Sequence, residues 1–361
     1  MTTATIDLAG LFATTLPKIN PKVTYDILRA HPLMLHMLRG GAFTVENGGS
    51  EIRCPVVLED SVNTGAVAKY ESFGITPEDT LDSARYQGWP KYRGSWTLDQ
   101  TEVDENSGPQ KVIDLAEAKQ NQTLHTFNAG VSADLMGDGT SLPAKRLKGI
   151  ETFIEFATEA QQAINARTPG GLPKATYANW RNKYGQITRF GVDGIEVMNT
   201  TYRACSSQGL HPDIGIADDV VYGFLEKELA PKQSLFDKDM ADFGYANVMF
   251  KEMPLVYDRD NLTGTGKIFF LTTTGRTVKG GIKPEMFTLP GLNGMPKNQG
   301  MGYGFQLHFL RQSTKTILRI DKPQKPVNQD ALVVNMYMNP LLSCSSIKRQ
   351  GAIDFSGSVI Y

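Results

Sequence analysis

The chain has 361 residues, of which 40% are hydrophobic and 21% charged, and 37 basic residues against 38 acidic ones leave a formal net charge of −1. This balance argues against a dedicated nucleic-acid-binding protein, which normally carries a basic excess. The length exceeds what one hydrophobic core usually supports, so two domains are expected. The 35 glycines and 19 prolines predict many turns and extended loops.

Targeting and redox signals are weak. Residues 1–16 contain no Lys or Arg and no small-residue cleavage motif, so no signal peptide is expected. No apolar run approaches the roughly 18 residues of a membrane span. The three cysteines, Cys54, Cys205 and Cys344, lie far apart and are odd in number. They predict neither a disulfide framework nor a zinc site, and synthesis in a reducing cytoplasm is the simplest interpretation.

The first hundred residues fall into two regions with different sequence patterns. Residues 1–48 have too few apolar side chains for a core of their own and are interpreted as an arm. Residues 51–59 predict a strand that Pro55 confines to an edge or a bulge. Residues 89–103, in which Trp96, Leu98 and Thr101 partly alternate, predict the returning strand. The thirty residues between them are mostly polar, and so long a loop suggests a function or a partner.

The stretch 107–136 predicts one long helix around which the rest is organised. Ser107 to Gln110 fits a capping box with Pro109 in the first turn. Apolar residues then recur mostly three or four positions apart, with a polar gap at Lys119 and Gln120. Gly137 and Gly139 predict its end. Nearly thirty residues span roughly 40 Å, which suits a strut with a sheet on one side.

Helices and short strands alternate after this helix. Helical spacing is predicted for 142–165 and 194–208, and a helix capped by Asp218 or Asp219 for the residues up to 229. Short strands are predicted at the following ranges: 213–217, 246–250, 254–257 and 267–271. The alternation favours an α/β or α+β domain.

The C-terminal third predicts strands and loops. Residues 272–303 are rich in Gly and Pro and predict a loop. Residues 305–309 alternate as a half-buried strand, with which 316–320 can pair. Residues 332–361 predict short strands and turns.

Signals for chemistry are absent or loose. Gly300–Gly304 precedes a strand and lacks the lysine of a phosphate loop. Asp258–Gly264 begins like a calcium loop but has Leu262 at a ligand position. The five histidines are isolated, and no third group orients Cys205 with His211. We therefore predict no catalytic residue, no metal site and no cofactor.

The order of elements carries a resemblance. An arm, a long two-stranded loop, a very long helix, an α/β domain and a return to strands resemble the major capsid proteins of tailed bacteriophages, which share the Hong Kong 97-type fold with encapsulins. Similar short strings occur in one group of phage capsid proteins: Gly170-Gly171 to Trp180–Asn182, Pro212-Asp213-Ile214, and Phe243-Gly244-Tyr245 leading to Phe250–Asp258.

The resemblance implies an α+β Hong Kong 97-type capsid fold and its division. The implied parts are an N-terminal arm (1–48), an extended two-stranded E-loop (49–105), a peripheral domain with spine helix and return strands (106–140 and 272–330), an α/β axial domain (141–271) and C-terminal strands (331–361). Aromatic and aliphatic residues of the loop region are the expected subunit contacts: Tyr70, Phe73, Ile75, Tyr86 and Trp89.

The implied function is structural. Chains would self-assemble as hexamers and pentamers into an icosahedral shell, part of the virion, which encloses double-stranded DNA without sequence-specific binding. Synthesis in the host cytoplasm is expected, with no membrane partner. Portal and decoration proteins are candidate partners, as is a separate scaffolding protein. An encapsulin-type compartment and, less favoured, a soluble α/β enzyme with a long lid loop are the alternatives.

Overall fold

A computed structural model describes residues 31–56, 58–59, 66, 68–69, 82–99, 101, 109–139, 145–206, 210–229, 247–251, 253–262, 264–273, 304–311, 317–326 and 330–356. The chain divides into two compact units. Unit 1 comprises Met1–Ser50, Gly88–Glu151 and Leu307–Leu342, and unit 2 comprises Glu51–Gln87, Thr152–Gln306 and Ser343–Tyr361. Each unit is therefore assembled from three separate stretches of the sequence.

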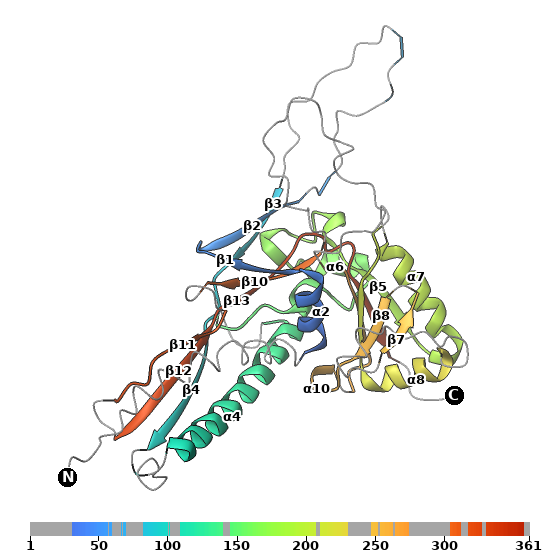
Figure 1. Ribbon diagram of the computed structural model, residues 1–361. Coiled ribbons are helices and arrows are strands. Elements are labelled where there is room, and N and C mark those ends of the chain that lie inside the picture. Colours follow the sequence, from blue (N-terminus) through green and yellow to red (C-terminus); the bar gives the residue numbers. More distant parts are fainter. Residues whose placement is uncertain are drawn as a thin grey trace, which may run out of the picture. The chain divides into compact units, whose positions relative to one another are not determined.

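Unit 1 contains the long helix α4 (Pro109–Met136) against a three-stranded sheet. In this sheet β12 (Ala331–Met338) lies between β4 (Tyr92–Asp99) and β11 (Arg319–Ile320), all antiparallel. Figure 1 shows α4 running alongside β4 and β12. The helix approaches β4 so closely at Gly94 that a Cβ there would lie 3.2 Å from the Phe127 ring.

The predicted long helix is confirmed, with 28 residues. Among the described side chains of 119–136, buried ones recur every three or four residues, as one face of a helix requires: Gln120, Leu124, Phe127, Val131 and Leu135, with Ser132 and Met136 buried beside the last two. The expected polar gap is wrong at Gln120, which is 2% exposed and continues the buried stripe, while Lys119 donates to the Thr97 carbonyl at 3.1 Å. Residues 107 and 108 of the capping box predicted over 107–110 lie outside the described residues.

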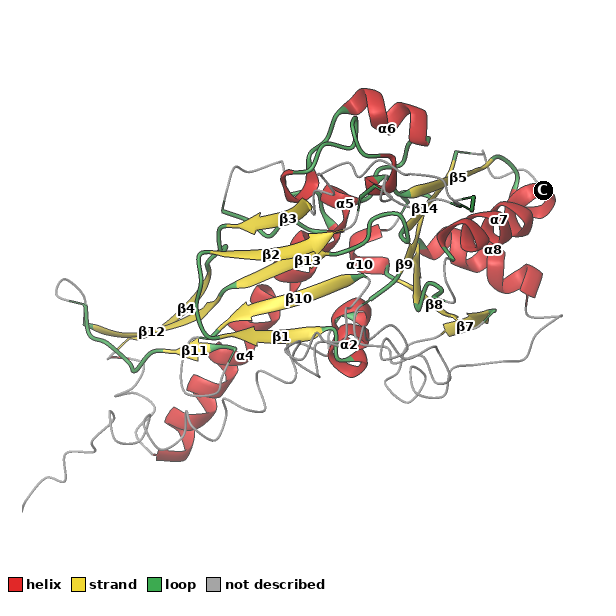
Figure 2. Cartoon of the chain, turned by 90° about the horizontal axis from the view of Figure 1, so that it is seen from above, coloured by secondary structure: helices red, strands yellow, loops and turns green. Residues whose placement is uncertain are grey.

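A second sheet has the order β1-β10-β13, with β1 (Phe43–Glu46), β10 (Phe305–Leu310) and β13 (Pro340–Cys344) (Figure 2). Strand β1 pairs with β10 in parallel, and the helix α2 (Pro32–Gly40) precedes it. The imidazole of His308 lies between these strands, with Nδ1 2.7 Å from the Thr44 hydroxyl and 3.2 Å from a Glu46 carboxylate oxygen. The strand predicted at 305–309 is confirmed.

Unit 2 is built on a mixed six-stranded sheet with the order β5-β14-β9-β6-β8-β7. The strands are β5 (Lys183–Ile187), β14 (Gly351–Phe355), β9 (Lys267–Leu271), β6 (Ile214–Ala217), β8 (Met253–Tyr257) and β7 (Asn247–Phe250). A π-helical turn, η3 (Phe190–Gly194), leads into α7 (Ile195–Cys205), which packs on β5 and β14, and α8 (Asp219–Leu229) packs on β8.

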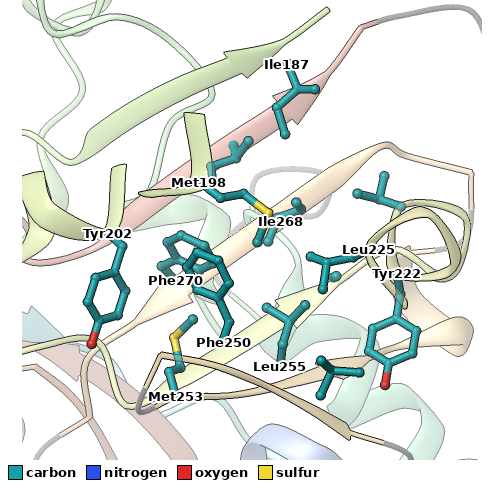
Figure 3. Packing of buried hydrophobic residues seen from close by; sticks show 14 of the residues in the cluster. Ile187, Met198, Tyr202, Tyr222, Leu225, Phe250, Met253, Leu255, Ile268 and Phe270 are labelled. Atoms are coloured by element: carbon teal, nitrogen blue, oxygen red, sulfur yellow. The ribbon is translucent and has the colours of Figure 1, made fainter. Parts of the chain in front are cut away.

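The core of unit 2 lies between this sheet and its helices. Figure 3 shows Met198 and Tyr202 of α7 and Leu225 of α8 meeting apolar side chains of the strands. All four residues of β6 are buried, as is expected for a central strand covered on both faces. The helices and strands predicted over 194–271 are confirmed in kind.

Unit 2 also contains a two-stranded hairpin. Strand β2 (Glu51–Val56) pairs antiparallel with β3 (Asp82–Gln87), and Pro55 lies opposite Ser83. The prediction that 89–103 is the returning strand is wrong, because β4 pairs with β12 instead. Strand β3 consists mostly of polar residues, so its alternation is hard to recognise from the sequence. In the structure Ala84 and Tyr86 are buried, and Arg85 and Gln87 are exposed.

Two further expectations are wrong. Residues 142–165 do not form one helix: within the described part, α5 (Ile150–Phe153) and α6 (Glu159–Asn165) are separate, because Thr158 starts a new helix by capping the Gln161 amide. Residues 319–320 pair with β12 rather than with the strand at 305–310. Both errors concern partners and breaks that short apolar patterns do not specify.

Candidate subunit-contact region

The β2–β3 hairpin presents two different faces. On β3, Ala84 and Tyr86 are buried, whereas Arg85 and Gln87 are exposed. Arg53 of β2 lies opposite Arg85 and is also exposed. Side chains alternate across a strand, so one face packs on unit 2 and the other is charged and open. A sheet of two strands is marginal by itself, so the packed face decides whether the hairpin holds its shape.

Tyr86 is the main anchor of that face. Its hydroxyl donates to the Cys344 carbonyl at 2.5 Å, and its ring lies 5.8 Å from that of Phe153. Burial raises the pKa of Tyr86 well above its usual 10, so the phenol stays a neutral donor. The side chain is 6% exposed. Tyr86 therefore contacts its own unit and has little surface for a neighbouring subunit.

Two short turns contact the hairpin and the residues that follow β2. In η1 (Pro169–Gly171), Gly170 has a φ of +66°, and a Cβ there would lie 3.0 Å from that of Ala84. Next along the chain, η2 (Ala178–Trp180) supplies Asn179, whose amide donates to the Leu58 carbonyl at 2.7 Å. Trp180 ties the two turns together by donating to the Pro169 carbonyl at 2.9 Å.

A buried ion pair holds these turns in place. The Lys174 side chain is fully buried, and its ammonium lies 2.8 Å from a Glu155 carboxylate oxygen. It also donates to the Phe153 carbonyl at 2.7 Å and to the Asn182 side-chain carbonyl at 3.3 Å. Lysines are almost never fully buried unless paired. Here the ammonium is surrounded by oxygen acceptors.

The partners of Lys174 are themselves fixed. The Asn182 amide donates to the Glu155 backbone carbonyl at 2.9 Å, and its oxygen accepts from the Glu155 amide at 2.9 Å. Asn165 donates to the second Glu155 carboxylate oxygen at 3.0 Å. Burial lowers the pKa of Lys174, and the bond to Glu155 opposes that shift. The network thus joins the end of α5, the end of α6, the link between η1 and η2, and the residue that precedes β5.

The remaining predicted contact residues fall in two groups. Trp89 belongs to unit 1, is half-buried and donates from its indole nitrogen to the Gly49 carbonyl at 2.8 Å. Tyr70, Phe73 and Ile75 lie outside the described residues. The structure thus brings Tyr86 together with η1 and the Lys174 network, and it places Trp89 in the other unit. All five remain predictions as subunit contacts.

Sequence reasoning missed Lys174 and Glu155. Lys174 stands in a stretch of Pro, Gly, Ala and Thr without periodicity, where a lysine is normally solvated. Glu155 falls where a continuous helix was expected. A lone lysine between a Gly-Gly turn and a turn that ends in Trp180 is the available signal, and it does not reveal burial.

Cys205 and Asp258, two of the residues considered for chemistry, lie in the described part of the chain, whereas residues 300–303 lie outside it. Cys205 is buried, which raises the pKa of its thiol to about 12, so it is no activated nucleophile. Asp258 caps the short helix α10 (Arg259–Leu262) by accepting from the Asp260 and Asn261 amides. Among described residues no group of His, Cys, Asp and Glu side chains could hold a metal ion. Within the same residues, no helix has the length and apolarity that a membrane span needs.

Comparisons with known proteins bear on the fold. No family model and no curated protein matches the chain. Among solved structures, it is similar to the holo-SrpI encapsulin complex from Synechococcus elongatus PCC 7942, with a TM-score of 0.50 and 10% identity over 86% of this chain and 84% of that chain.

Two further solved structures are also similar to the chain. The capsid of an empty GTA particle has a TM-score of 0.49 and 13% identity over 88% of this chain and 89% of that one. A structure of Gordonia phage Cozz has a TM-score of 0.48 and 11% identity over 90% and 87%. Of these three, the encapsulin likeness bears on the fold of this chain. The expected resemblance to the capsid fold that encapsulins share is confirmed, at the level of the fold.

Proposed function

We propose that this chain is a capsid-shell subunit that self-assembles as hexamers and pentamers into the icosahedral shell around the double-stranded DNA of a tailed phage. The observation that carries the proposal is the fold shared with an encapsulin over 86% of the chain. The proposal assigns the chain to the virion after synthesis in the host cytoplasm. It includes no catalytic activity and no cofactor.

Several features support the finer assignment. We assign the β2–β3 hairpin as the base of the E-loop, because it has one anchored face and one open charged face. We assign α4 as the spine helix, because its buried stripe faces β4 while residues such as Asn121 and His125 are exposed. Open faces on an anchored scaffold suit contacts repeated between identical subunits.

The segment between β2 and β3 is proposed to contact a neighbour. It contains Tyr70, Phe73 and Ile75, and burying each across a subunit boundary would contribute about 1.5–3 kcal/mol, less the cost of ordering the segment. The small exposed remainder of Tyr86 is proposed to add to this contact, and Trp89 of unit 1 is proposed as a separate subunit contact.

Electron microscopy of the purified chain tests the proposal, since shells support it and small monodisperse oligomers contradict it. A sharper variant replaces residues 61–80 by a Gly-Ser link, which leaves both strands of the hairpin intact. We expect native circular dichroism but no particles on sedimentation. A second variant replaces Tyr70, Phe73 and Ile75 by Ser without shortening the chain, and we expect it to lose particles as well. Full-size particles from both variants would contradict the E-loop assignment.

An encapsulin-type compartment is the second candidate, because the likeness to the encapsulin structure supports a shell subunit of either kind. The contents of the shell distinguish the two: nuclease-protected DNA supports the phage assignment, and a protein cargo without DNA supports the compartment. Scaffolding, portal and decoration proteins are proposed partners for the phage shell alone. A stoichiometric metal or nucleotide found by mass spectrometry would contradict the structural role.

A further inference from the structure

Three buried polar side chains of unit 2 lie close enough together for a covalent reaction between them. Lys174 and Asn182 have no exposed surface, and Glu155 is 4% exposed. The Lys174 Nζ atom lies 2.8 Å from Glu155 Oε1 and 3.3 Å from Asn182 Oδ1. A base within hydrogen-bond reach of a nucleophile is the arrangement that activates a side chain for attack. Here the nucleophile is an amine, the base is a carboxylate, and the group beside them is a primary amide.

Glu155 is positioned to take a proton from the amine. A lysine attacks only as the neutral amine, and burial lowers the pKa of Lys174 while Glu155 opposes that change. The carboxylate is held by Asn165, which donates to its Oε2 at 3.0 Å, and its Oε1 lies beside Lys174. Because both groups are buried, the proton passes directly from one side chain to the other.

The Asn182 side chain is fixed, and its carbonyl is polarised. Its Oδ1 accepts from the Glu155 backbone N–H at 2.9 Å, and such a donor stabilises the negative charge that develops on the oxygen during attack. Its Nδ2, the leaving group, donates to the carbonyls of Glu155 and Lys183 at 2.9 and 3.2 Å. With a C=O bond of about 1.2 Å, Cγ lies within about 4.5 Å of the lysine Nζ. A small shift of the lysine side chain brings Nζ to the roughly 3–3.5 Å from which attack begins.

We infer that Lys174 and Asn182 form an amide bond within the chain, with Glu155 as the carrier of protons. Lys174 first gives a proton to Glu155, and the neutral Nζ then attacks Asn182 Cγ. Glu155 passes its proton to Nδ2 and takes one from Nζ, after which the Cγ–Nδ2 bond breaks and ammonia leaves. The product is a secondary amide beside a neutral carboxylic acid, so all protons are accounted for and the step needs no oxidant or reductant.

The bond replaces a buried charged pair with neutral groups. Burying charges is costly even when they are paired, so the loss of both charges favours the amide. Only eight positions separate Lys174 from Asn182, so the bond closes a short loop and adds less stability than a long-range crosslink would. The loop contains η2, whose Asn179 contacts the Leu58 carbonyl after β2. The inference goes beyond the proposed shell function and does not depend on assembly.

Mass spectrometry of the full-length, unassembled chain tests the inference. We expect an intact mass lower than that of the sequence by one ammonia, and a branched tryptic peptide that joins residues 168–181 to Asn182-Lys183. Glu155→Gln keeps the shape of the side chain but cannot carry the protons, and Lys174→Met removes the nucleophile. Both variants should keep the full mass. Lys183→Met is the matched control, because it removes a neighbouring lysine but leaves the three groups in place, and it should still lose ammonia.

Each outcome decides the inference. A folded chain that keeps its full mass and gives no branched peptide, once its mass has stopped changing, would overturn it. So would a mass loss that persists in Lys174→Met, which would mean that Asn182 cyclises onto its own backbone. A branch at Gln162, whose Oε1 lies 3.5 Å from the lysine Nζ, would overturn the assignment to Asn182.

Two controls keep the result independent of folding and assembly. Circular dichroism identifies a variant that fails to fold, and the branched peptide of the unaltered chain then decides the inference alone. Chains that carry the amide bond but form no shells would contradict the proposed shell function and leave this inference standing.

Discussion

The six-stranded sheet and the segment 153–182 belong to one unit but have opposite kinds of interior. The sheet is held by an apolar core to which strands and helices contribute through many small contacts. The segment 153–182 has short helices, and at its centre lies the Lys174–Glu155 ion pair with oriented hydrogen bonds. The apolar contacts are non-directional and tolerate change gradually. The polar network works only when every partner is in place.

The difference between an apolar and a polar interior indicates the structural role of each region. Helices satisfy most backbone groups within the element and strands satisfy theirs by pairing with neighbouring strands, so both need a core mainly to bury surface. An irregular segment needs directional bonds to adopt one geometry, and the hairpin rests on that geometry through Gly170 and Asn179. We therefore expect the polar region to govern hairpin position and the apolar region to govern stability of the sheet.

The largest effect should come from Lys174→Met, which leaves the Glu155 carboxylate buried without its partner. Removing one member of a buried pair costs about 3–5 kcal/mol. Arg167 lies 3.7 Å from that carboxylate but is 47% exposed, so its compensation is partial. Urea unfolding followed by circular dichroism measures the loss.

A double variant sharpens this result. Lys174→Met with Glu155→Leu removes both charges and should recover most of the stability. The bonds from the ammonium to the Phe153 and Asn182 oxygens stay lost. We therefore expect stable chains that give few particles on sedimentation. Normal particle yield from the double variant would show that the network does not position the hairpin.

Substitutions in the apolar core of the six-stranded sheet should lower the free energy of unfolding gradually. Leu255 of β8 is fully buried, and Leu255→Ala should lower the free energy of unfolding by about 2–5 kcal/mol through lost burial and a cavity. Leu255→Ile, which conserves volume, should cost less than about 1.5 kcal/mol. The same urea titration applies, and equal losses for both variants would contradict a graded core.

A smaller effect is expected from Gly170→Ala. The positive φ costs a residue with a Cβ about 1–2 kcal/mol, and the methyl group would also press on Ala84 of the hairpin. Gly171→Ala is the matched control, since Gly171 has a φ of +80° but a Cβ added there would meet no other atom within 4 Å. Particle yield should fall for Gly170→Ala alone. Equal yields would show that the turn does not support the hairpin.

The smallest effect concerns pH and unit 1. Burial lowers the pKa of His308 below its usual 6.5, and the bond to Glu46 opposes this. The unfolded chain therefore binds more protons than the folded one in the window below about 6.5. Stability should fall as the pH drops through that window, by up to about 1.4 kcal/mol for each unit of pKa difference. His308→Gln should flatten this dependence in urea titrations on either side of the window, and an unchanged slope would exclude His308 as its source.

Local patterns predicted the elements better than their partners. The long helix was predicted from apolar spacing, and the strand 267–271 from its run of apolar residues, because both signals lie within the element itself. Strand β3 was missed, since two buried side chains among four polar ones form too weak an alternation. In the candidate site, the aromatic residues could be selected from composition, whereas nothing in the sequence around Lys174 indicates that its side chain is buried.

The sequence by itself determined an α+β chain with one very long helix, short strands alternating with helices, and no recognisable catalytic motif. Periodicity and capping are properties of neighbouring residues, so they can be read without knowing the fold. The tertiary structure decided that β4 pairs with β12, and that Lys174 is fully buried beside Glu155 and Asn182. Those outcomes depend on which distant segments meet, because burial and pairing are set by long-range contacts that no local pattern encodes.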